Sequence, residues 1–126
     1  MWRVDTTDTF DEWFDALDDT DRANVLASLM LLQEKGPMLP RPHADTVNNS
    51  THSNMKELRV QSKGRPLRAF FAFDPQRSAI LLCAGDKTGD EKRFYKEMIP
   101  VADREFTAHL ANVKKKRKGK DDGKNT

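Results

Sequence analysis

Two arginines in the middle of the chain are the residues whose placement most directly suggests chemistry. Two apolar runs, 55–60 and 67–73, flank a polar turn at Lys63-Gly64, and this pattern predicts a β-hairpin. If the hairpin turns tightly there, Arg59 lies directly opposite Arg68 on one face of the sheet. Like charges in opposed positions destabilise a pair of strands unless an anion lies between them. A phosphate held by two guanidinium groups would fit that position.

Two other interpretations of the arginine pair are open at this stage. Both side chains could be solvated on an exposed face of the sheet. Pro66 could also shift the pairing of the strands by one residue, which would undo the arginine pair. The stretch from Met55 to Lys96 nevertheless carries more lysines and arginines than carboxylates, and an excess of positive charge favours an anionic partner.

The hairpin belongs to a predicted antiparallel three-stranded meander, whose third strand is expected at 78–83. Residues 2–5 could form an opening strand. Two antiparallel helices are predicted between that strand and Gly36-Pro37, which is a typical helix end. Thr9 and Glu12 match a capping box, so Thr9 is the predicted N-cap of the first helix. Residues 18–20 can cap the second helix.

The segments around the meander complete a small α+β domain over residues 1–113. Residues 37–54 form a long predicted loop that contains His43 and His52, each of which could be a general base or a solvated side chain. Residues 90–98 are predicted to be helical, and Pro100 would open a separate further helix. The acidic helical hairpin is expected to cover one face of the sheet, and the other face or its rim to carry the basic residues.

Charge is distributed unevenly along the 126 residues, although the net charge is only +2. Residues 1–35 carry nine acidic and three basic residues, whereas residues 114–126 carry seven basic and two acidic ones. The basic end is predicted to be a disordered tail that can contact RNA phosphates or simply aid solubility.

Single-residue signals elsewhere in the chain exclude several classes of site. Cys83 is the only cysteine, and its apolar strand predicts a buried, inert thiol. The histidines show no metal-ligand spacing. No signal peptide or membrane-spanning segment is visible, so a cytoplasmic protein is expected.

Several short segments occur in an order and spacing that are typical of one family. They are Lys56-Glu57-Leu58-Arg59, Gly64, Arg68-Ala69-Phe70-Phe71, residues 81–89, Phe94-Tyr95, residues 99–103, Phe106 and His109-Leu110. With these segments the chain resembles the RelE/ParE superfamily of bacterial toxins, and most of all the HigB-type toxins and their phage-encoded relatives. The resemblance covers about half of the chain and implies a RelE-like fold with C-terminal helices.

The resemblance implies the toxin of a type II toxin–antitoxin pair, which enters the A site of the 30S ribosomal subunit and cleaves mRNA. In such an endoribonuclease the ribose 2′-hydroxyl attacks the adjacent phosphate without a metal ion or another cofactor. The reaction needs a base, cations that stabilise the charged intermediate, and an acid for the leaving oxygen. The implied catalytic residues are Arg59, Arg68, Lys87 and Tyr95, and the implied RNA-binding residues are Lys56, Lys63, Arg65, Lys92 and Arg93.

The implied roles differ in how closely this sequence matches the family. Arg59 and Arg68 match the arginines that hold the phosphate, and Lys87 matches a basic residue that stabilises the transition state or acts as the acid. Tyr95 could stack on a base or transfer a proton. Only one cation stands at Asp86-Lys87, where a basic pair is typical. The general base is left open between Lys56, His52 and Tyr95.

Two other functions fit the same fold, because a fold alone does not determine activity. One is a ParE-like toxin that inhibits DNA gyrase without cleaving nucleic acid, and the other is a noncatalytic basic protein that binds RNA or regulates transcription. For the toxin, the resemblance also implies a helix-turn-helix antitoxin as partner.

Overall fold

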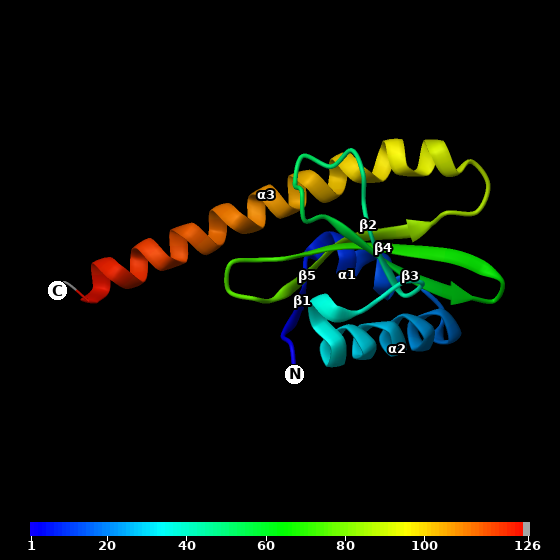
Figure 1. The fold of residues 1–126 in the computed structure, drawn as a ribbon, viewed down its shortest axis with the longest axis horizontal. Helices are drawn as coiled ribbons and strands as arrows, with labels where there is room; N and C mark the ends of the chain where they lie inside the picture. The colour runs from blue at the N-terminus through cyan, green and yellow to red at the C-terminus, as the bar shows by residue number, and fades with distance from the viewer. Residues whose placement is uncertain (125–126) are drawn as a thin grey trace.

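The computed structural model of the chain contains one five-stranded sheet with helices packed on both of its faces (Figure 1). It describes the backbone of residues 1–124 and the side chains of residues 1–116. The elements are β1 (Val4–Thr6), α1 (Asp8–Asp15), α2 (Asp19–Lys35), a 3-10 turn (Gly36–Met38), β2 (Ala44–Thr46), β3 (Lys56–Ser62), β4 (Arg65–Phe73), β5 (Ala79–Asp86) and α3 (Glu91–Lys124). The strand order is β1-β5-β4-β3-β2, with β1 parallel to β5 and every other pair antiparallel.

The register of the β3–β4 hairpin confirms the sequence-based prediction. Arg59 pairs with Arg68, and Gln61 pairs with Pro66, so the proline causes no shift. Lys63 and Gly64 form the turn with φ angles of 53° and 76°. Two successive positive φ angles are the geometry of the tight hairpin turn that matches the twist of the flanking strands, and glycine adopts it without steric cost.

Successive side chains of the central strands point to opposite faces of the sheet, and the core therefore has two layers. On one face, Leu67 and Ala69 of β4 pack with residues of α1 and α2, among them Phe10 and Leu32. On the other face, buried side chains of β4 and β5 pack against α3; they include Phe70, Ile80, Leu82, Ile99, Ala102 and Phe106. The acidic helices thus cover one face as predicted, and α3 covers the second face.

The first turn of α1 differs from the prediction. The N-cap is Thr7, whose hydroxyl accepts a hydrogen bond from the backbone N–H of Phe10 at 3.1 Å. Thr9 instead donates to the carboxylate of Glu105 on α3. The predicted capping box at Thr9 is therefore wrong, because the N-cap lies two residues earlier and the Thr9 hydroxyl bonds to a side chain of another helix. Asp18 caps α2 as predicted, by accepting from the N–H of Asp21 at 2.9 Å.

The predicted loop at 37–54 contains the short edge strand β2, which pairs with the first half of β3. A strand of only three residues is too short to show the alternation of apolar and polar side chains from which strands are predicted. Its pairing places Asp45 beside Glu57 and Ala44 beside Leu58. The residue before β2, His43, accepts a hydrogen bond of 2.8 Å from the backbone N–H of Arg59, whereas the loop that follows β2 begins opposite Met55.

The predicted helix break before Pro100 is wrong, because α3 runs without interruption from Glu91 to Lys124. Proline at this position removes one helical hydrogen bond. Ile99 on one side of it and Ala102 and Phe106 on the other are all buried against the sheet, and this packing holds both parts of the helix in line. No described helix is both long enough and apolar enough to span a membrane.

The predicted basic tail, residues 114–126, is described only in part. The backbone is helical as far as Lys124, and residues 125–126 lie outside the described residues. Its disorder in the free protein stays a prediction.

Candidate functional site

The anion between Arg59 and Arg68 is a side chain of the protein itself. Arg59 Nε donates a hydrogen bond of 2.9 Å to Oε2 of Glu57, and Arg68 Nε lies 3.6 Å from the same oxygen. Tyr95 Oη donates to the other carboxylate oxygen at 2.6 Å. The Glu57 residue is only 3% exposed. A buried carboxylate thus balances two guanidinium groups that would otherwise repel each other.

Strand geometry explains why these side chains meet. Glu57 and Arg59 are two residues apart on β3, so both point to the face that α3 covers. Arg68 lies opposite Arg59, and Phe70 lies opposite Glu57. The Tyr95 ring of α3 packs edge-on against the Phe70 ring, with 6.1 Å between centroids. This contact directs the phenol group toward Glu57.

The two arginines differ in their remaining contacts. Arg59 also donates from Nη2 to Asp45 of β2 at 3.1 Å, and its side chain is about one-third exposed. Arg68 is buried, and its Nη1 donates to the carbonyl of Leu67 at 3.0 Å. Among the described residues its Nε forms no hydrogen bond, since 3.6 Å to Glu57 is an ion-pair distance. Arg59 is therefore the more accessible cation of the pair.

Burial raises the pKa of Tyr95 to about 12, and its hydrogen bond to Glu57 adds to the effect. The phenol is therefore protonated at neutral pH and acts as a donor to the carboxylate. The hydrogen bond to Glu57 also raises the pKa of Arg59. Glu57 thus accepts hydrogen bonds from Tyr95 and Arg59 and forms an ion pair with Arg68.

A cleft of about 680 Å³ opens above Glu57 and Arg59. One of its walls is formed by β2 and the following loop, and the other by the first turns of α3. The residues that line it are Asp45, Thr46, Val47, Asn48, Asn49, Glu57, Arg59, Lys92, Tyr95, Lys96, Ile99 and Pro100. Lys92 and Lys96 are four residues apart and thus neighbours on the helix surface. They place positive charge along one wall of the cleft.

Lys87 lies next to this site but does not line the cleft. Its Nζ is 5.9 Å from the centroid of the Tyr95 ring and 3.2 Å from Oε1 of Glu91. The backbone N–H of Lys87 donates to the carbonyl of Pro66 at 2.8 Å, which fixes this loop against β4. The four residues predicted as catalytic are thus grouped around Glu57 and Tyr95.

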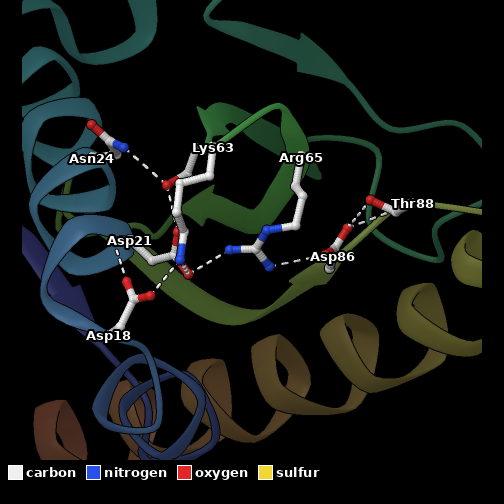
Figure 2. Close-up of polar contacts among 8 residues, drawn as sticks. Asp18, Asp21, Asn24, Lys63, Arg65, Asp86 and Thr88 are labelled. Atoms are coloured by element: carbon white, nitrogen blue, oxygen red, sulfur yellow. Dashed lines mark hydrogen bonds and ion pairs between the residues drawn. The ribbon is translucent and has the colours of Figure 1, made fainter.

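Lys63 and Arg65, predicted to bind RNA, belong to a different cluster that packs against α2 (Figure 2). Lys63 forms an ion pair with Asp18, and Arg65 bridges Asp21 and Asp86, with 3.1 Å from its Nη1 to the Asp86 carboxylate. Odd-numbered Arg65 points to the face opposite even-numbered Arg68. We call Asp18, Asp21, Lys63, Arg65 and Asp86 the α2-face cluster.

Most of the other residues predicted to bind RNA or to act as the general base also lie outside the cleft. Lys56 precedes Glu57 on β3 and therefore points to the opposite face of the sheet. Arg93 pairs with Glu97 at 3.0 Å on the outer side of α3. His52 contacts Thr107 at 2.9 Å, away from the cleft lining. Of the predicted RNA-binding residues, only Lys92 lines the cleft.

Glu57 is a residue of this site that was not predicted from the sequence. The available signal was its spacing, because position 57 shares a face with Arg59 and supplies the anion that the arginine pair requires. We call Glu57, Arg59, Arg68 and Tyr95 the α3-face cluster. Among the described residues, no group of histidines, cysteines and carboxylates could hold a metal ion. Cys83 is buried, and burial raises its pKa to about 12, so it is a protonated thiol.

Comparison with known sequences gives a consistent result. Residues 12–107 match the family described as "Phage derived protein Gp49-like (DUF891)". The chain is 45% identical over 111 residues to "Putative toxin HigB2" of Mycobacterium tuberculosis, covering 87% of this chain and 55% of that protein. It is 48% identical over 102 residues to "Putative toxin HigB3" of the same organism, covering 81% and 88%. The chain thus spans about half the length of the first relative and most of the second.

Two solved structures have a similar fold. One is a double arginine-to-alanine mutant of Escherichia coli toxin RelE in the free state, with a TM-score of 0.54 and 11% identity over 74% of this chain and 90% of that one. The other is the archaeal RelE–RelB complex from Pyrococcus horikoshii, with a TM-score of 0.50 and 12% identity over 69% and 96%. These similarities confirm the predicted RelE-like α+β fold.

Proposed function

The chain belongs to the phage-derived Gp49-like family, and we propose that it is the toxin of a type II toxin–antitoxin pair that cleaves mRNA on the ribosome. The observation that carries the proposal is the α3-face cluster, where two arginines and a tyrosine converge on one carboxylate beneath a cleft with a lysine-lined wall. The names of the two mycobacterial relatives support the assignment as a toxin.

The substrate in this proposal is a single RNA strand whose phosphates follow Lys92 and Lys96 along the cleft. Arg59 is the most accessible cation at its base, so the scissile phosphate contacts this guanidinium. Arg68 lies behind it and adds positive charge in a buried setting, where electrostatic stabilisation of a charged intermediate is strongest. The two guanidinium groups therefore suit the negatively charged phosphorane intermediate better than a neutral ligand.

The proposed reaction uses protein side chains for both proton transfers. Glu57 accepts the proton of the ribose 2′-hydroxyl, and the 2′-oxygen forms a new bond to phosphorus. The bond from phosphorus to the 5′-oxygen breaks, and the ammonium of Lys87 donates a proton to that oxygen. The products are a 2′,3′-cyclic phosphate and a 5′-hydroxyl end. Tyr95, protonated at neutral pH, holds Glu57 in position.

The test is translation of a defined mRNA in extract, with cuts mapped by primer extension. We expect cuts in the presence of ribosomes and intact RNA in their absence, and Glu57→Gln should abolish them. Intact mRNA together with cleaved DNA–gyrase complexes would instead establish the gyrase-inhibiting function.

We further propose a helix-turn-helix antitoxin as the partner of this chain. Support comes from an archaeal protein of similar fold, which was solved in complex with RelB. The product of the neighbouring gene should copurify with this protein and restore growth when both are expressed. Failure of both would contradict the partnership.

A further inference from the structure

The two walls of the cleft differ in chemistry. The α3 wall carries the cationic residues Lys92 and Lys96, whereas the loop after β2 contributes Asn48 and Asn49, whose side chains end in carboxamides. Cations bind phosphates of any sequence, while nucleobases are distinguished by paired donors and acceptors. A carboxamide offers both a donor and an acceptor. The cleft therefore combines a wall suited to the RNA backbone with a wall suited to base edges.

The loop that carries the two asparagines is fixed to α3 by three contacts. Ser50 Oγ donates to Oδ1 of Asp103 at 2.5 Å, and the backbone N–H of Thr51 lies 3.1 Å from Oδ2 of the same carboxylate. His52 Nε2 lies 2.9 Å from Oγ1 of Thr107. Because Asp103 and the cleft lysines belong to the same helix, the two walls keep a fixed separation.

The carboxamides of Asn48 and Asn49 are free to bind a ligand. Both residues are exposed, and within the described part of the chain neither carboxamide is hydrogen-bonded to the protein. Asn49 has a φ angle of 70°, a left-handed conformation that asparagine tolerates better than most residues. Both asparagines are among the residues that line the cleft.

We propose that Asn48 and Asn49 bind the edge of the nucleobase next to the scissile phosphate and so determine which RNA sequences the cleft accepts. The inference rests on the proposed function, because it takes the cleft to be the RNA site. The lysine wall then supplies affinity that is independent of sequence, and the asparagine wall supplies discrimination between bases.

The test measures binding of four short RNAs that differ in one base, each with a 2′-deoxyribose at the cleavage position so that no cut can occur. Fluorescence anisotropy gives the dissociation constant of each. The wild type should distinguish its best base from its worst by about tenfold. In Asn48→Ala/Asn49→Gly this ratio should fall below about threefold, with little change for the worst base. Glycine at position 49 keeps the positive φ angle accessible.

Lys92→Ala/Lys96→Ala is the matched control from the opposite wall. It should weaken binding of all four RNAs by a similar factor and preserve their ratio. An unchanged ratio in the asparagine variant, or equal binding of all four RNAs by the wild type, would overturn the proposal.

A parallel assay separates this inference from the nuclease itself. Cleavable mRNA is incubated with ribosomes and each protein, and the base next to every cut is counted. If the wild type discriminates in binding but never cuts, the nuclease proposal fails and base recognition stands. If the asparagine variant cuts with the same base preference as the wild type, base recognition fails and the nuclease stands.

Discussion

The β3–β4 hairpin carries a cluster of basic and acidic side chains on each face, and the two clusters have different roles. In the α2-face cluster, three carboxylates surround Lys63 and Arg65 (Figure 2). Lys63 pairs with Asp18 and Asp21 at the start of α2, and Arg65 joins Asp21 of α2 to Asp86 of β5. In the α3-face cluster, Arg59 and Arg68 share one buried carboxylate below an open cleft. The same residue types therefore hold elements together on one face and present positive charge on the other.

Register decides which cation joins which cluster. Arg65 and Arg68 are three residues apart on one strand, so they point to opposite faces of the sheet. The acidic helix α2 covers the first face, whereas the second is covered by α3, whose first turns carry lysines. A count of basic residues in the hairpin could not separate the two groups, since both contribute to the same local excess of positive charge.

The largest expected effect is on catalysis, from Glu57→Gln. This change keeps the size of the side chain but removes the proposed proton acceptor, so ribosome-dependent cleavage should fall by about 10²–10⁴-fold. The cleavage rate of purified protein on a defined mRNA measures the effect, and circular dichroism controls for folding. Retention of more than a tenth of the wild-type rate would remove Glu57 from the mechanism.

The next effect is on stability, from Arg68→Ala. The sequence alone leaves open an exposed position for this arginine, where its removal would cost little stability. Arg68 is instead 9% exposed and pairs with Glu57. Breaking a buried pair from one side destabilises a protein by about 3–5 kcal/mol. Urea denaturation measures this loss, and Arg77→Ala, at an exposed site, is the control. Equal stability of the two variants would contradict the buried pairing.

A smaller effect is expected from acid on the α2-face cluster. Hydrogen bonds from the Ser62 hydroxyl and then from Arg65 lower the pKa of Asp21 below its ordinary 3.8, and a hydrogen bond from Lys63 does the same for Asp18. Such carboxylates stabilise the fold fully above pH 3.8, and their contribution is lost as the pH falls through the lowered pKa values.

The free energy of unfolding, measured by urea denaturation at successive pH values, should therefore decrease below about pH 4. Asp21→Asn should show a shallower decrease, because the variant lacks one of the titrating groups. A variant curve parallel to the wild-type curve would show that Asp21 has no lowered pKa.

The smallest effect is expected from Lys63→Ala. This exposed side chain pairs with Asp18 at the surface, where solvent screens the attraction. Both the midpoint of thermal unfolding and the rate of mRNA cleavage should stay close to those of the wild type. A large loss of cleavage would place Lys63 in the RNA site and would weaken the distinction between the two faces.

The hairpin was predictable from sequence because its determinants are local. Lys63-Gly64 specifies the turn, the apolar runs specify the strands, and together they fix Arg59 opposite Arg68. The need for an anion between the arginines was also predictable. The sequence also places Glu57 on the same face as Arg59, because the two residues are two positions apart on one strand, but it does not by itself distinguish an internal carboxylate from an external phosphate.

The features that escaped prediction depend on contacts distant in sequence. The helix continues through Pro100 because residues on both sides of it are buried against the sheet. Thr9 bonds to Glu105 rather than capping its own helix. The burial of Arg68 follows from α3 covering its face, and the loss of Arg65 from the predicted RNA surface follows from Asp21 on α2. None of these partners can be identified from local patterns.

The most direct test of the account compares Arg59→Ala with Arg65→Ala, two identical substitutions on opposite faces of one hairpin. Ribosome-dependent cleavage of a defined mRNA is measured for both purified variants at equal concentration of folded protein. We predict a loss of about 10²-fold or more for Arg59→Ala and a rate within about threefold of the wild type for Arg65→Ala. Equal losses in the two variants, or a greater loss for Arg65→Ala, would contradict the assignment of catalysis to the α3-face cluster.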